Sequence, residues 1–113
     1  MNPCSLSDWL QLPTHPPDRE HGFMMYPLVL KRPDMPRADV IRYLERHRIE
    51  TRYLLPLINQ PIYRQRFGNL DAEYPVAARL NETAFYVGCH PEITGPEIDY
   101  MIACFHACFR AAR

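Results

Sequence analysis

The stretch that most constrains the fold spans residues 49–64, where a strand pattern stops abruptly. Ile49, Thr51 and Tyr53 alternate with charged residues, and this period of two is expected of a short strand with one buried face. Pro56 then ends the strand, because proline has no amide hydrogen to give to a sheet. The sequence therefore predicts a strand that leads directly into a different kind of structure.

A long segment without a clear period follows, from Leu55 to Ala72. Connections of more than about 12 to 15 residues are uncommon in small domains and are usually functional or mobile. We therefore predict a long polar loop that meets a ligand or a neighbouring chain. The side chains available there for hydrogen bonds are Asn59, Gln60, Tyr63, Arg64 and Arg66.

The remaining elements follow from apolar periods and from the positions of proline. We expect strands at Phe23–Lys31 and Thr83–Cys89, and helices at Pro36–His47, from Pro75 onward and at Pro96–Ala111. The order strand, helix, strand, loop, helix, strand, helix predicts an α/β two-layer sandwich. In this architecture the helices pack on a small mixed or antiparallel sheet.

Helical spacing also predicts which apolar residues each helix buries. They are Val40, Ile41 and Leu44 in the first helix, Val76, Ala77 and Leu80 in the second, and Ile98, Met101 or Ile102, Phe105, Cys108 and Phe109 in the third. Thr94 and Glu97 have the spacing of a capping box, which marks the start of the last helix.

Length and charge limit the classes of protein to consider. At 113 residues, with 47% of them apolar, the chain can bury one modest core and is too short for two domains. It has no apolar run of about 18 residues and no basic-then-apolar leader, so we expect neither a membrane span nor a signal peptide. The 13 basic and 13 acidic residues balance, which gives no general attraction to nucleic acid or to an anionic membrane. We therefore expect a soluble cytoplasmic protein.

Several short segments occur in the order and at the spacing of one enzyme family. They are LQLP (Leu10–Pro13), REHGFMMYPLVLK (Arg19–Lys31), IETR (Ile49–Arg52), PL, QP-x-Y (Gln60–Tyr63), YPVA (Tyr74–Ala77) and FYVG (Phe85–Gly88). The ordered set resembles the C-terminal part of the sugar-nucleotide aminotransferases of the DegT/DnrJ/StrS type. This resemblance extends over nearly the whole chain.

The resemblance implies a domain organisation and an activity. Residues 1–21 would form an N-terminal hook and linker, and residues 22–113 a small domain like the C-terminal domain of fold-type I aminotransferases. The intact family enzymes use pyridoxal phosphate (PLP) to move an amino group onto a keto sugar attached to a nucleotide, in polysaccharide, O-antigen or antibiotic sugar biosynthesis. They are typically homodimers, and we expect the large PLP-binding domain to be a missing partner of this chain.

The lysine content argues against catalysis by this chain alone. A PLP-dependent aminotransferase needs a lysine that holds the cofactor as a Schiff base and moves a proton. The chain has a single lysine, Lys31, which ends a predicted strand and does not match the family's PLP-lysine motif. We therefore expect no catalytic residue and no bound cofactor here.

Within the family, the resemblance implies that this domain helps to close the active-site cleft and lines its sugar-nucleotide side. By position in the matching motif, the substrate-binding candidates are Arg52, Tyr53, Asn59, Gln60 and Tyr63. The residues themselves leave alternatives open. Arg52 and Tyr53 point to opposite faces of a strand and can make ordinary cross-strand contacts, while Gln60 and Tyr63 can anchor the loop to the domain body.

Two positions depart from the family pattern. Ile58 stands where many members carry His, which removes a polar contact. Arg48 stands where the family tends to have Gly, just after the first predicted helix. Because a left-handed residue other than Gly costs about 1 kcal/mol, we expect this helix to end differently.

A local surplus of basic residues allows two interpretations. Residues 31–66 contain nine basic and four acidic residues. This basic region can meet the phosphates of a sugar nucleotide or an acidic partner domain. Alternatively, Arg42, Arg46 and Arg48 form the solvated side of a helix.

Other functional classes have weaker support. A zinc site at Cys104, Cys108 and the Cys89–His90 pair is disfavoured, because no C-x-x-C pair occurs and the helical cysteines fit an apolar face. Nucleic-acid binding lacks the required pattern of basic and stacking aromatic residues. The alternative that we retain is a free-standing interaction or regulatory module derived from the same domain.

Overall fold

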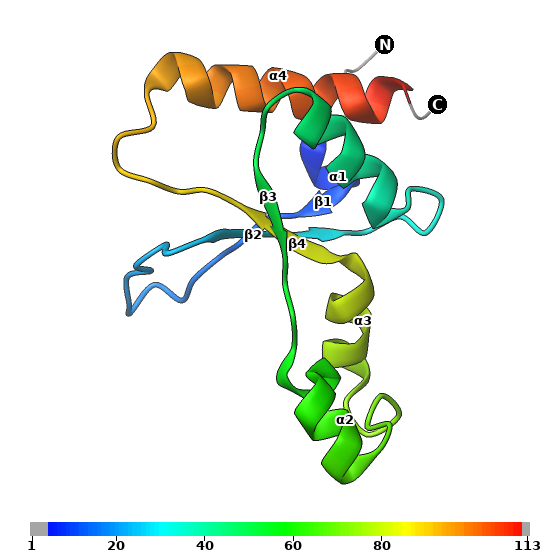
Figure 1. Ribbon diagram of the computed structural model, residues 1–113. Coiled ribbons are helices and arrows are strands. Elements are labelled where there is room, and N and C mark those ends of the chain that lie inside the picture. The colour runs from blue at the N-terminus through cyan, green and yellow to red at the C-terminus, as the bar shows by residue number, and fades with distance from the viewer. Residues whose placement is uncertain (1–4, 112–113) are drawn as a thin grey trace.

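The computed structural model, which describes residues 5–111, combines four strands with α and 3₁₀ helices (Figure 1). In chain order the elements are η1 (Leu6–Asp8), β1 (Leu10–Gln11), β2 (Tyr26–Leu30), α1 (Arg37–Arg46), β3 (Thr51–Tyr53), η2 (Leu57–Asn59), α2 (Pro61–Phe67), α3 (Pro75–Thr83), β4 (Ala84–Val87) and α4 (Gly95–Ala111). The η elements are 3₁₀ helices. The predicted strands and helices therefore occur in the predicted order, with slightly shorter strands.

The four strands form one antiparallel sheet in the order β1-β2-β4-β3. In its middle, Phe85 of β4 lies opposite Leu28 of β2 and Tyr53 of β3. α1 and α4 lie on one side of the sheet, whereas α2 and α3 extend from the other side (Figure 1). The predicted α/β two-layer sandwich is confirmed, and its sheet is antiparallel.

The hydrophobic core lies between the sheet and the two covering helices. Leu28 and Phe85 of the sheet share one buried cluster with Val40 of α1 and Phe109 of α4. Trp9 stacks on Phe109, with ring centroids 5.0 Å apart and an interplanar angle of 7°. The N-terminal segment thus contributes a buried aromatic side chain, while the division of the chain at residue 21 stays a prediction.

The end of α1 corrects one expectation. Arg48 adopts a left-handed conformation, with φ of 62°, although it is not glycine. The Ile49 amide donates to the Leu44 carbonyl at 3.0 Å and the Arg48 amide to the Glu45 carbonyl at 3.1 Å, which is the hydrogen-bond pattern of a Schellman motif. Ile49 and Leu44 are both buried, so their packing compensates for the strain at Arg48. The helix therefore does not end differently.

The start of α4 is as predicted, but part of its buried face is not. The Glu97 amide donates to Thr94 Oγ1 at 3.3 Å, which confirms the cap. Ile98 was expected inside, yet it is 47% exposed. Of the two alternatives Met101 and Ile102, Met101 packs against the core, whereas Ile102 is 43% exposed. Both isoleucines belong to the first half of α4, and this half extends past α1 in Figure 1.

The segment predicted as a structureless loop contains helices. η2 and α2 lie between β3 and α3, and we call residues 54–83 the arm. α2 begins with Pro61 at its first position and ends at Gly68, which adopts a φ of 72°. Within the described residues, η2, α2 and α3 bury no side chain. The expectation that Val76 lies inside is wrong, since it is 65% exposed. The arm extends away from the sheet (Figure 1).

Candidate functional site

The base of the arm is the point where β3 ends and β4 begins. The Leu54 amide donates to the Ala84 carbonyl at 3.4 Å, so the two ends of the arm lie side by side. Tyr53, the last residue of β3, is half-exposed, and the Arg37 guanidinium lies over its ring, 4.2 Å from the centroid. Arg37 Nη1 also donates to the Ala84 carbonyl, at 2.8 Å. Burial lowers the pKa of Arg37.

Inside the arm, a polar cluster joins η2 to the connection between α2 and α3. Asn59 Nδ2 donates to Asp71 Oδ1 at 3.4 Å, and Arg64 Nη2 approaches the same oxygen at 3.5 Å. The Asn59 Oδ1 atom is buried and makes no hydrogen bond within the described residues. Asn59 therefore links η2 to Asp71 through its amide nitrogen. Its side-chain oxygen remains available to accept a hydrogen bond from a ligand or a water molecule.

Gln60 and Tyr63 lie at the start of α2. The Gln60 carbonyl accepts from the Tyr63 and Arg64 amides at 3.0 and 3.1 Å, so Gln60 starts the helix through its backbone. Its half-buried side chain makes no capping hydrogen bond. The Tyr63 ring contacts Phe67, with centroids 5.9 Å apart. These local contacts fit the interpretation of loop anchoring, and they leave the Gln60 amide available for a ligand.

The side chains of Arg52 and Tyr53 lie on opposite faces of the sheet. Arg52 pairs with Tyr86 across the sheet, whereas its neighbour Tyr53 pairs with Phe85. Arg52 Nη2 makes an ion pair of 2.7 Å with Glu50. The structure thus gathers Asn59, Gln60 and Tyr63 in one arm and puts Tyr53 at its base, with Arg52 on the opposite face of the sheet from Tyr53. A substrate contact for each of the five residues stays a prediction.

Sequence reasoning missed Arg37 and Asp71. Arg37 is the first residue of α1, where the helix dipole disfavours a positive charge. A positive charge at this unfavourable position was a signal in the sequence that Arg37 makes a contact outside α1. Asp71 gave no signal, because its partners Asn59 and Arg64 are brought to it only by the fold of the arm.

The residues of this chain do not fit PLP. Lys31 Nζ donates to the Ser7 carbonyl at 2.8 Å, and the Lys31 amide donates to the Trp9 carbonyl. Lys31, directly after β2, therefore bonds to the N-terminal segment. Within residues 5–111, it forms no ion pair with an acidic side chain. No chemical step through the cofactor follows from these residues.

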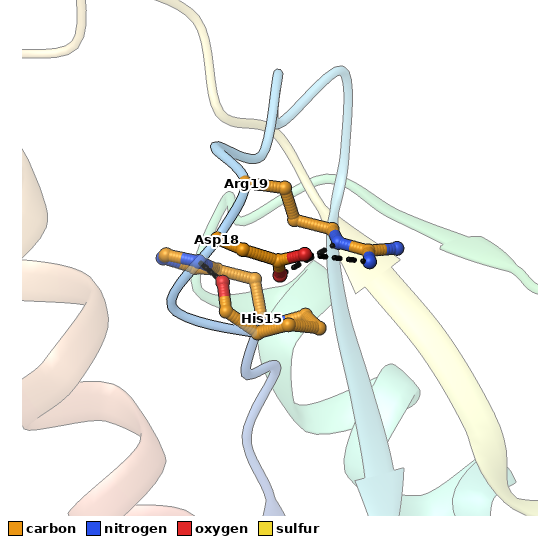
Figure 2. Close-up of polar contacts among 4 residues, drawn as sticks. His15, Asp18 and Arg19 are labelled. Carbon is orange, nitrogen blue, oxygen red and sulfur yellow. Dashed lines mark hydrogen bonds and ion pairs between the residues drawn. The ribbon is translucent and has the colours of Figure 1, made fainter.

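Two further features carry no catalytic chemistry. In the connection between β1 and β2, Arg19 forms two hydrogen bonds of 3.2 Å with Asp18, beside His15 (Figure 2). This ion pair holds the pKa of Asp18 below its usual range, but all three residues are exposed and such pairs contribute little to stability. Burial raises the pKa of Cys108 to about 11, which makes its thiol unreactive.

Residues 5–111 contain no group of three or more His, Cys, Asp or Glu side chains placed to hold a metal ion. Within the same residues, no helix has the length and apolar character that crossing a membrane requires.

An apolar hollow of about 450 Å³ lies apart from the arm, between the first half of α4 and the sheet. Leu28, Val87, Ile98 and Phe105 are among its lining residues, and none of the five predicted site residues is. Its apolar lining is suited to contact with another hydrophobic surface rather than to binding of a nucleotide sugar.

Comparisons with known proteins support the resemblance. A model of the DegT/DnrJ/EryC1/StrS aminotransferase family matches residues 5–106. The lipopolysaccharide biosynthesis protein RfbH of Salmonella typhimurium (strain LT2) is 25% identical to the chain over 108 residues. This match covers 93% of the chain and 25% of RfbH, so the chain spans about a quarter of the length of this curated relative.

Proposed function

Because the chain belongs to the DegT/DnrJ/EryC1/StrS aminotransferase family, we propose that it is the C-terminal small domain of a PLP-dependent aminotransferase acting on a nucleotide-linked keto sugar. The observation that carries this proposal is the family match over residues 5–106. The name of RfbH, a lipopolysaccharide biosynthesis protein, supports a cell-surface polysaccharide as the destination of the sugar.

The proposal divides the work between two parts of a cytoplasmic, homodimeric enzyme. The Schiff-base lysine belongs to the large domain, since Lys31 is engaged with Ser7 and the chain has no other lysine. The chain described here is then inactive alone. Its contribution is to bind and orient the substrate and to help close the cleft.

The arm is the part of the chain suited to this contribution. Its helices bury no side chain within the described residues, and beyond α3, which touches β2 and β4, it extends away from the sheet (Figure 1). Gln60 and Tyr63 offer an amide and a phenol, which donate and accept hydrogen bonds as sugar hydroxyls require. Tyr53 stands at the base of the arm, where its half-exposed ring can stack on a nucleotide base.

A titration of the isolated chain tests the substrate contact. Backbone amide shifts are followed by NMR while nucleotide diphosphate sugars are added, with PLP as a control ligand. We expect shifts confined to residues 52–66 and none with PLP. Gln60→Ala should weaken these shifts, whereas the control Gln65→Ala, within the helix that Gln60 precedes, should not. A folded chain that shows no shifts would overturn the binding role of the arm.

A chimera tests the enzyme class. The segment of a family aminotransferase that matches this chain is replaced by residues 5–111, and transfer of the amino group to the keto sugar is measured. We expect activity in the chimera and none in either part alone. A soluble, dimeric chimera without activity would instead favour the interaction module.

A further inference from the structure

We propose that Arg37 is a positioning residue that fixes the direction of the arm relative to the sheet. This inference rests on the proposed function, because the arm matters to substrate binding through Asn59, Gln60 and Tyr63. The contacts of Arg37 themselves do not depend on that function.

Arg37 contacts both ends of the arm from a third element. Its guanidinium lies over the ring of Tyr53, the residue before the arm, and its Nη1 donates to the carbonyl of Ala84, the residue after it. The two contacts measure 4.2 Å, to the ring centroid, and 2.8 Å. A single side chain of α1 therefore joins the strand that enters the arm to the strand that returns from it.

The Ala84 carbonyl is the shared acceptor at this junction. It accepts from Arg37 at 2.8 Å and from the Leu54 amide at 3.4 Å, so the guanidinium makes the shorter of the two bonds. Beyond Leu54 the strand pairing ends, and Pro56 has no amide hydrogen to continue it. On the β3 side, the direction of the arm is thus set at residues 53 and 54, where Arg37 acts.

The rest of the arm is weakly held. In the described chain, η2, α2 and α3 bury no side chain, and the arm contacts the sheet mainly through α3, which touches β2 and β4. The Arg37 guanidinium lies over the Tyr53 ring at the base of this weakly held arm. Loss of Arg37 should therefore let the arm change direction while the core stays folded.

Arg37 is unfavourable for the stability of α1 itself, which indicates that its role lies in the contacts with Tyr53 and Ala84. A positive charge at the first helical residue is disfavoured by the helix dipole, and burial lowers the pKa of Arg37 further from its usual value. The carbonyl of Ala84 and the face of Tyr53 compensate for both costs. Lysine would keep the charge but lose the planar group that stacks and donates at once.

Residual dipolar couplings of the isolated chain test the proposal, because they report the orientation of amides in the arm relative to those in the sheet. In the unaltered chain, one alignment should describe the couplings of α2, α3, β2 and β4. Arg37→Ala should shrink the couplings of α2 towards zero while those of the sheet keep their values. Arg37→Lys should show an intermediate loss.

Arg42→Ala is the matched control, since Arg42 is an exposed residue of α1 that pairs with Asp39 on the same helix. It should leave all couplings unchanged. Should Arg37→Ala fail to fold, Tyr53→Leu removes the other half of the contact and should give the same loss in α2. Unchanged couplings of α2 in a folded Arg37→Ala chain overturn the proposal.

The same variants separate this inference from the proposed function. If Arg37→Ala loosens the arm but nucleotide diphosphate sugars cause no shifts even in the unaltered chain, the positioning role stands and the substrate role fails. If sugars bind and the arm keeps its direction in Arg37→Ala, the substrate role stands and the positioning role fails.

Discussion

At Arg48 the backbone holds a conformation that favours glycine. An arginine at a φ of 62° brings its Cβ too close to the backbone, at a cost of about 1 to 2 kcal/mol. Glycine removes that strain but adds about 0.5 to 1 kcal/mol of entropy to the unfolded chain. The balance favours glycine at this position.

We therefore expect Arg48→Gly to raise the free energy of unfolding by about 0.5 to 1 kcal/mol in urea titrations. Arg48→Ala is the control, because it shortens the side chain and keeps the strain, and it should give no gain. Equal effects of the two variants would mean that the arginine side chain, rather than the backbone conformation, sets the stability of this turn.

The hydrogen bonds of Glu45 should make the free energy of unfolding depend on pH. The Thr51 amide and hydroxyl donate to Glu45 Oε1 at 3.0 and 2.8 Å, and these bonds lower the pKa of Glu45 in the folded chain. A lowered folded-state pKa gives stability that is present above the unfolded value, about 4.5, and is lost as the pH falls through the folded value. Glu45 therefore stabilises the fold at neutral pH.

Replacement of Glu45 with Gln should reduce the loss of unfolding free energy that occurs when the pH falls from 7 to 3. We expect the difference in unfolding free energy between the unaltered chain and Glu45→Gln to shrink when urea titrations are moved from pH 7 to pH 3. Glu92→Gln, on an exposed connection, controls for the loss of one charge. A difference that stays constant down to pH 3 would show that the charge of Glu45 does not strengthen these bonds.

Among the elements, α2 should open most readily. A helix of seven residues is too short to be stable alone in water, and this one buries no side chain. β4 pairs with β2 along its whole length, and both strands contribute side chains to the core. Hydrogen exchange should therefore be fast at the amides of α2 and slowest in β4. Protection in α2 equal to that in β4 would contradict this, and would mean that the arm is stable without a partner.

The same contrast explains which elements the sequence predicts. Strands and helices that pack on the core leave an apolar period, as Val40 and Leu44 do in α1. α2 leaves none, because it buries no side chain within residues 5–111, so its residues were interpreted as a loop. Only local signals marked it, namely Pro61 at its start and Gly68 at its end.

The candidate site shows a similar limit. Asn59, Gln60 and Tyr63 were found through a family motif, and the structure gathers them in one arm. Arg37 contacts Ala84, 47 positions away, and no sequence period links the two residues. Contacts that cross from one element to another at a junction depend on the tertiary fold, so a reading of local patterns does not find them.

At the scale of the whole molecule, the apolar residues left outside are as informative as the core. Ile98 and Ile102 face the hollow of about 450 Å³ beside the sheet, and Leu55, Leu57, Ile62 and Val76 are exposed on the arm. Three quarters of RfbH lies outside the match to this chain. We propose that the corresponding part of an intact enzyme covers some of these surfaces, which would otherwise promote association.

This proposal predicts that the isolated chain binds the apolar dye ANS and self-associates with rising concentration, through the hollow beside α4. Ile102→Gln should lower both the dye fluorescence and the weight-average mass in sedimentation. It should change the unfolding free energy by less than about 0.5 kcal/mol, because the side chain is 43% exposed already. Ile62→Gln, which makes the same change at a 52% exposed site on the arm, is the matched control and should leave dye binding at the hollow intact. A larger loss of stability in Ile102→Gln would show that Ile102 belongs to the core, and equal effects of the two variants would show that the association does not use the hollow.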